Sequence, residues 1–85
     1  MSKVIFDERA WDDYLYWQET DKKMLKRINL LLKDIARCGN EGIGKPELLK
    51  HREGWSRRID NYHRLVYVFK DDSIEILQCK GHYDD

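Results

Sequence analysis

The hydrophobic periodicity of the chain changes once, and this change limits the folds that the sequence can adopt. Over residues 21–38, apolar side chains recur at helical spacing and form a single stripe: Met24, Ile28, Leu31, Leu32 and Ile35. The last third consists instead of three short runs of β character, separated by polar turns: residues 55–59, 63–69 and 74–79. A helix with one apolar face and a meander of strands predict helices packed on one face of a mostly antiparallel sheet.

The first third of the chain supplies one more strand and one more helix. Residues 4–6 predict a short strand, Asp7 is suited to cap the next helix, and residues 8–19 are helix-compatible and rich in aromatic side chains. We expect Thr20 to cap the second helix, over residues 21–38. The predicted order is therefore β-α-α-β-β-β, an α+β fold with two N-terminal helices packed on a twisted, mostly antiparallel sheet.

Glycine and proline mark the connection between the second helix and the meander. Gly39-Asn40 is expected to end the helix. Residues 40–54 are expected to form a loop, because they contain three glycines and the only proline of the chain. This loop is too short to separate domains, and 85 residues suffice for one compact domain. We therefore expect a single domain over residues 1–85.

Composition excludes several classes of protein. Hydrophobic residues make up 41% of the chain, which argues against intrinsic disorder. No apolar run approaches the roughly 20 residues of a membrane helix, and the N-terminus lacks the features of a signal peptide. We therefore expect a cytoplasmic protein with no membrane contact, whose two cysteines, Cys38 and Cys79, are free thiols.

The net charge is zero, but the charges are segregated along the chain. Residues 1–21 carry six acidic and two basic side chains, residues 22–70 carry five acidic and thirteen basic ones, and residues 71–85 carry five acidic and one basic. The basic middle could form a local surface whose contacts to phosphate weaken with salt. A solvated helix face with scattered strand charges explains the pattern equally well, so both interpretations stay open.

The first hairpin of the meander predicts which side chains share a face. A three-residue turn at 60–62 places Arg58 directly opposite Arg64 on the outer face of the sheet. The same register collects apolar side chains on the inner face: Trp55, Ile59, Leu65, Tyr67 and Phe69. Like charges directly opposite each other are destabilising unless an anion lies between them, so this register is consistent with an anion site.

The residue types available for chemistry do not indicate a metal or a nucleophilic side chain. The three Asp-Asp pairs diverge because sequence neighbours point in different directions, and the three histidines lack metal-ligand spacing. We expect neither a metal nor another cofactor. Neither cysteine lies in an evident activating context.

Glutamate, histidine and arginine remain, and these suffice to cleave RNA, whose own 2′-hydroxyl is the nucleophile. Glu47 lies in the predicted loop, and His82 lies at the end of the last strand. Each candidate also has an ordinary explanation: Glu47 and His82 as solvated side chains, Arg57 and Arg58 as surface charges, Tyr83 as a capping aromatic. The residues alone therefore indicate a basic α+β domain with an anion site, and they do not establish an enzyme.

Six sequence blocks carry information that the single residues lack. In chain order they are WDDYLYWQETDK at 11–22, GIGKPE at 42–47, LKH at 49–51, WSRRI at 55–59, HRLVY at 63–67 and HY at 82–83. Their joint presence and order over residues 11–83 resemble the YoeB/Txe family of the RelE/ParE toxin superfamily.

The resemblance implies a RelE-like fold and a toxin of a type II toxin–antitoxin system. Such a toxin is a ribosome-dependent, metal-independent endoribonuclease that cleaves mRNA in the A site and blocks translation. Attack by the 2′-hydroxyl would leave a 2′,3′-cyclic phosphate and a 5′-hydroxyl. The implied partners are a cognate YefM-like antitoxin and mRNA on the 70S ribosome, with operator DNA bound only through the antitoxin. A homodimer stays open.

The resemblance also implies roles for six residues. Three are catalytic: Glu47 as general base on the 2′-hydroxyl, His82 as general acid, and Arg64 as the clamp on the phosphate. Three contact the substrate: Lys50, Arg58 and Tyr83. The chain departs from the family pattern at Arg52-Glu53-Gly54, which is about two residues short, at Lys80-Gly81, where bulkier residues are expected, and at the added Asp84-Asp85.

Two other functions compete with this one. A ParE-like toxin would act by binding gyrase without cutting RNA, but the presence of Glu47, Arg64 and His82 together argues against it. A non-catalytic nucleic-acid-binding module would need exposed aromatic side chains for base stacking, whereas most aromatics here occupy positions predicted to be buried. Codon preference and the identity of the antitoxin do not follow from the sequence.

Overall fold

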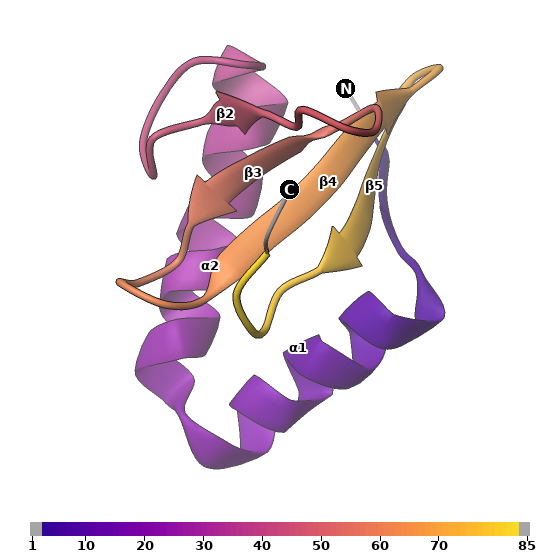
Figure 1. Cartoon of the computed structure of the whole chain (residues 1–85). Helices are drawn as coiled ribbons and strands as arrows, with labels where there is room; N and C mark the ends of the chain where they lie inside the picture. Colours follow the sequence, from indigo (N-terminus) through magenta and orange to yellow (C-terminus); the bar gives the residue numbers. More distant parts are fainter. Residues whose placement is uncertain (1–2, 84–85) are drawn as a thin grey trace.

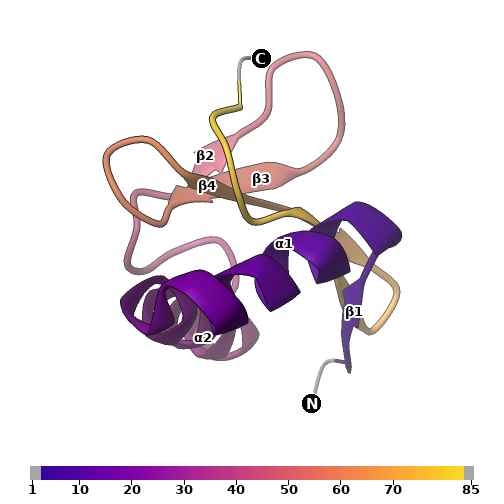
Figure 2. The same cartoon turned by 90° about the horizontal axis from the view of Figure 1, so that it is seen from below.

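The computed structural model describes residues 3–83, in which two helices pack on one face of a five-stranded sheet (Figure 1). The elements are β1 Lys3–Phe6, α1 Glu8–Thr20, α2 Lys22–Cys38, β2 Glu47–Leu48, β3 Trp55–Arg58, β4 Arg64–Lys70 and β5 Ser73–Gln78. The strand order is β1-β5-β4-β3-β2, with β1 parallel to β5 and all other pairs antiparallel. Both helices lie on one side of the sheet, and the segment after β5 rises on the other (Figure 2). The predicted fold class and packing are confirmed, with one additional strand, β2.

Aspartates begin both helices. The Asp7 side chain accepts a hydrogen bond from the Ala10 backbone N–H at 2.8 Å, as predicted for the cap of α1. The prediction that Thr20 caps α2 is wrong. Thr20 is the last residue of α1, and its hydroxyl donates to the Tyr16 carbonyl at 2.7 Å. Asp21 caps α2 instead, because its backbone is extended and its carboxylate accepts from two N–H groups in the first turn.

The stripe on α2 forms the centre of the core, as the periodicity predicts. Ile28, Leu31 and Ile35 are buried, and they pack in one cluster with inward-facing residues of the sheet: Leu65, Tyr67, Ile74 and Ile76. Met24 and Leu32 are partly buried at the margin of this cluster. The helix ends at Gly39, whose φ of +67° is a conformation that favours glycine.

The predicted hairpin register is confirmed. Arg58 lies opposite Arg64, and the Ile59 N–H donates to the His63 carbonyl at 2.9 Å across the predicted turn. The predicted inner-face residues all belong to the core or pack against it. The alternative explanation of Arg57 as a surface charge does not hold, because Arg57 is fully buried on the inner face, opposite Leu65. Alternation along β3 requires this placement, since Arg57 lies between two inward-facing positions.

Residues 40–54 were expected to be a loop, but they contain β2. Glu47 pairs with Ser56 and Leu48 with Trp55, so β2 extends the sheet beyond β3. Two residues are too few to show an alternating pattern, and the pairing depends on the free edge of β3. In residues 3–83 no helix is long and apolar enough to cross a membrane.

Candidate functional site

A polar pocket of 180 Å³ opens on the outer face of the sheet, away from both helices. It is lined by Lys45, Glu47, Ser56, Arg58, Arg64, His82 and Tyr83. Five of the six residues assigned from the sequence therefore lie around one hollow. Lys50 is the exception, because it is exposed and does not line the pocket. Lys45 and Ser56 are lining residues that the sequence did not single out.

Strand pairing brings the glutamate and the two arginines together. Glu47 pairs with Ser56 on β3, and Arg58, two residues further along β3, pairs with Arg64 on β4. Residues two apart on a strand point to the same face, so all these side chains share the outer face. The pocket therefore has a basic floor with a carboxylate at its β2 edge.

The Arg64 guanidinium is held by the turn that precedes it. It donates to the backbone carbonyls of Asp60 at 3.0 Å and His63 at 3.1 Å. None of the ion pairs within residues 3–83 involves Arg58 or Arg64. Two cations on neighbouring strands that form no ion pair within the described part of the chain make a site suited to an anion.

The connection from α2 to β2 is fixed by the buried Arg57. All five N–H donors of its guanidinium have acceptors: the Tyr67 hydroxyl at 3.0 Å, the Asp34 carboxylate, and the carbonyls of Gly39 at 2.7 Å, Glu41 at 2.9 Å and Ile43 at 3.0 Å. Burial alone would lower the pKa of Arg57, but the hydrogen bonds to Asp34 and Tyr67 outweigh burial and raise it. The hydrogen bond from Arg57 lowers the pKa of Asp34, so the pair is ionised.

Gly44 continues this connection to the pocket. Its carbonyl accepts from the Arg58 N–H at 2.7 Å, and its φ is +81°. A Cβ at this position would lie 2.9 Å from Leu31 Cδ2 and 3.1 Å from the Arg58 carbonyl oxygen. Because only glycine fits this close approach, Lys45 and Glu47 are brought to the edge of the pocket.

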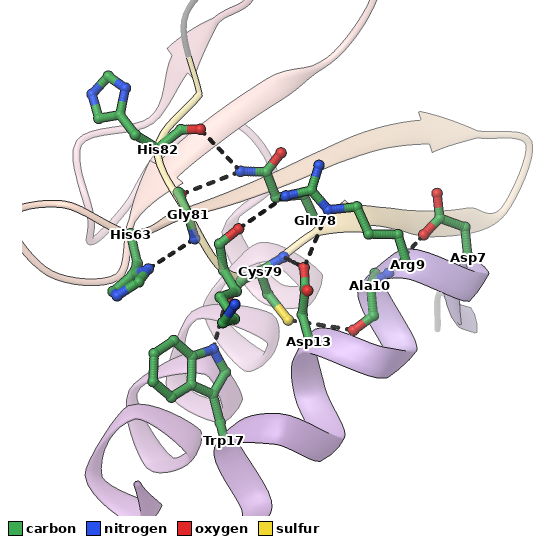
Figure 3. A network of polar contacts seen from close by, with 11 residues as sticks. Asp7, Arg9, Ala10, Asp13, Trp17, His63, Gln78, Cys79, Gly81 and His82 are labelled. Atoms are coloured by element: carbon green, nitrogen blue, oxygen red, sulfur yellow. Dashed lines mark hydrogen bonds and ion pairs between the residues drawn. The ribbon is translucent and has the colours of Figure 1, made fainter. Parts of the chain in front are cut away.

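The segment after β5 carries the last two pocket residues, and α1 holds its beginning (Figure 3). The Trp17 indole N–H donates to the Cys79 carbonyl at 2.8 Å, and the Cys79 N–H donates to the Asp13 carboxylate at 3.1 Å. The Gln78 amide donates to the His82 carbonyl at 3.4 Å. In Figure 3 the His82 imidazole points away from α1. His82 lines the pocket together with Tyr83. The added residues Asp84-Asp85 lie outside the described residues.

The cysteines lie apart from the pocket and are free thiols. Cys38 is exposed at the end of α2, whereas Cys79 is buried against α1. Burial raises the pKa of Cys79 to about 12. A thiol with this pKa is protonated at neutral pH, which makes it a poor nucleophile.

A larger hollow of 380 Å³ is lined by parts of the same outer face and by the loop before β3: Arg52, Glu53, Val68, Phe69, Lys70, Glu75 and Leu77. It contains no histidine and none of the six residues assigned from the sequence. Within the described part of the chain, no three His, Cys, Asp or Glu side chains form a group that could hold a metal ion. The smaller pocket is therefore the candidate active site.

Comparisons with known proteins agree on one family. A sequence model described as the YoeB-like toxin of bacterial type II toxin–antitoxin systems matches residues 6–83. Toxin YoeB of Escherichia coli strain K12 is 58% identical over 83 residues, which is 95% of this chain and 99% of that protein.

Solved structures of similar chains have the same fold. The YoeB dimer from Staphylococcus aureus aligns with a TM-score of 0.91 at 52% identity, over 96% of this chain and 98% of that one. The toxin in a heterotetrameric YoeB–YefM toxin–antitoxin complex from the same species aligns with a TM-score of 0.89 at 51% identity, over 98% of this chain and 99% of that one.

Proposed function

The chain belongs to the YoeB-like toxins of bacterial type II toxin–antitoxin systems, and we propose on this basis that it is an endoribonuclease that cleaves mRNA in the ribosomal A site without a metal. One observation carries the proposal. A carboxylate, an imidazole and two guanidinium groups line a single pocket, and they come from Glu47, His82, Arg58 and Arg64. These are the groups that transfer of a phosphoryl group to the neighbouring 2′-hydroxyl requires.

The reaction assigns one step to each group. The Glu47 carboxylate takes the proton from the 2′-hydroxyl, and the 2′-oxygen then attacks phosphorus. Arg64, with Arg58 opposite it, stabilises the negative charge that develops on the non-bridging oxygens. The His82 imidazolium gives its proton to the departing 5′-oxygen. The products are a 2′,3′-cyclic phosphate and a 5′-hydroxyl, and the nucleophile belongs to the substrate.

The remaining assigned residues bind RNA around this centre. Tyr83 lines the pocket, and we assign it a contact to the nucleotide at the scissile bond. Lys50 lies outside the pocket, so we assign it a contact to RNA beyond the scissile phosphate. Lys45, two residues before Glu47, also lines the pocket and adds positive charge to it.

We propose a YefM-like antitoxin as the protein partner, since the similar toxin from Staphylococcus aureus forms a complex with YefM. An acidic, partly disordered antitoxin segment would fold onto the basic pocket and displace residues 80–83. Operator DNA would be bound only through the antitoxin. A homodimer is consistent with the dimer of the Staphylococcus aureus protein. We place the reaction in the cytoplasm, where ribosomes translate the mRNA.

The test is cleavage of a defined mRNA on purified translating ribosomes, mapped by primer extension. We expect one cut in the A-site codon that withstands chelation, with ribosome integrity checked separately. His82→Gln should lower the rate about 10²–10⁴-fold while ribosome binding persists. His51→Gln is the matched control, because His51 is exposed and does not line the pocket.

Two results would contradict the proposal. A 5′-phosphate product would require an activated water molecule in place of the 2′-hydroxyl. Inhibition of gyrase supercoiling by the protein, without cleavage of mRNA, would show that it acts by binding, as a ParE-like toxin does.

A further inference from the structure

Gly81 directly precedes His82, and both its N–H and its carbonyl are hydrogen-bonded to the hairpin, by the consecutive residues His63 and Arg64. The Gly81 N–H donates to Nδ1 of His63 at 2.8 Å (Figure 3). The Gly81 carbonyl accepts from the Arg64 N–H at 3.0 Å. His63 immediately precedes β4, so these bonds join the C-terminal segment to the strand that carries Arg64. The backbone of His82 is therefore positioned relative to the floor of the pocket.

The His63 ring is itself fixed. It packs edge-on against the indole of Trp17, with ring centroids 4.8 Å apart, and against Tyr62 at 5.2 Å. Trp17 is buried and donates to the Cys79 carbonyl, two residues before Gly81. Tyr62 also lies 5.6 Å from the His82 ring. The imidazole thus connects the core under α1 with the residues around His82.

Acceptance by Nδ1 requires a particular form of His63. A neutral imidazole has one acceptor nitrogen, so the proton must sit on Nε2 when Nδ1 accepts from the Gly81 N–H. Gly81 has a φ of +93°, a conformation that other residues rarely adopt. Glycine adopts this conformation freely, whereas a bulkier residue would be strained there.

We propose that His63 is a positioning residue, which fixes the Gly81 peptide through Nδ1 and thereby aims His82 at the leaving oxygen. The inference rests on the proposed function, because it assumes that His82 transfers a proton. Acid catalysis depends steeply on geometry, and a displacement of about 1 Å can cost on the order of 10²-fold in rate. Loss of the Nδ1 acceptor should therefore lower the rate of the chemical step more than it lowers binding.

Substitutions at His63 can separate the hydrogen bond from the packing of the ring. Asparagine puts an amide oxygen at the place of Nδ1 but removes the ring. Phenylalanine keeps a ring against Trp17 but has no acceptor. Glutamine carries the same amide as asparagine one bond further out, and so tests whether the position of the acceptor matters.

The experiment measures single-turnover cleavage on saturating programmed ribosomes and the amide NMR signal of Gly81 for the full chain. We expect His63→Asn to retain cleavage within about threefold and the Gly81 signal close to its original position. We expect His63→Phe and His63→Gln to lose about 10²-fold in rate at saturation, with little change in half-saturating ribosome concentration. Tyr14→Phe is the control for loss of a hydrogen bond elsewhere in the fold. It removes the 2.7 Å bond from the Tyr14 hydroxyl on α1 to the Asn29 side chain on α2.

Three outcomes would overturn the inference. If His63→Phe cleaves RNA and His63→Asn does not, His63 matters only for the packing of its ring. If His63→Gln cleaves RNA as fast as His63→Asn, the position of the acceptor is irrelevant. An unchanged Gly81 signal in the Phe variant would show that the bond does not set the backbone, and this holds even if the protein cleaves no RNA. Failure of the wild-type chain to cleave would refute the proposed function alone.

Discussion

Replacing Arg57 with methionine should destabilise the protein far more than the same replacement of its neighbour Arg58. The substitution keeps a long apolar side chain but removes all five donors of the buried guanidinium. It leaves the Asp34 carboxylate without its main partner and frees three carbonyls of the connection to β2. Removing one partner of a buried ion pair typically costs about 3–5 kcal/mol.

That cost is large for a chain of this size. Small domains have a total stability of roughly 5–15 kcal/mol, and for 60–100 residues each kcal/mol lowers the melting temperature by about 4–8 °C. We therefore expect Arg57→Met to melt on the order of 12–40 °C lower than the wild type. Because Arg57 fixes the loop that leads to Glu47, cleavage should fall as well, even below the melting temperature.

Arg58→Met is the matched control, since it makes the same change one residue along the strand. Arg58 is exposed on the outer face and lies opposite Arg64. Its loss should leave stability within about 0.5 kcal/mol, or raise it slightly as repulsion is relieved, while cleavage falls. We therefore expect Arg57→Met to affect mainly stability and Arg58→Met to affect mainly activity.

Thermal and urea unfolding of both variants measure the difference. A double variant, Asp34→Ala with Arg57→Met, should recover a large part of the stability lost in Arg57→Met, because no unpaired charge then remains buried. The reasoning would be refuted if Arg57→Met lay within about 1 kcal/mol of the wild type, or if Arg58→Met destabilised the protein equally.

Three further predictions concern the clamp, the pH dependence of stability and the thiols. Arg64→Ala should lower the cleavage rate severely without lowering the melting temperature. The cleavage rate of Arg64→Lys should also stay well below that of the wild type, because lysine lacks the bidentate guanidinium fork. A lysine variant as active as the wild type would count against this role. The pKa of Asp34 is lowered in the folded state, mainly by the hydrogen bond from Arg57, so its stabilising effect is present above the unfolded pKa of about 3.9 and is lost as pH falls below that value. Urea midpoints between about pH 6 and 2 should show this slope, and the slope should be smaller in Arg57→Met; an equal slope in both proteins would contradict the assignment. Ellman's reagent should modify exposed Cys38 in the folded protein and reach buried Cys79 only after unfolding, whereas rapid reaction of both thiols would contradict the burial.

The errors of the sequence analysis share a cause. Thr20 and Asp21 are both good caps, and only the extended backbone between α1 and α2 decides that Asp21 is used. Arg57 fits the inner face by alternation, but its charge suggested the surface. The energetic cost of burying its charge is offset by hydrogen-bond acceptors that lie 10 to 23 residues away in the sequence. Local patterns do not contain such partners.

The sequence by itself determined the two helices, the fold class and the register that places Arg58 opposite Arg64. These follow from side-chain periodicity and turn length, which act between residues close in the chain. Together with the sequence blocks, they also indicated five of the residues that line the pocket. The tertiary structure decided how those residues meet: β2 forms only against the edge of β3, and the segment with His82 is fixed by partners on α1 and in the hairpin, among them Trp17, Asp13 and His63. The contacts of this segment with α1 span 62 and 66 residues, and they exist only after the core has formed.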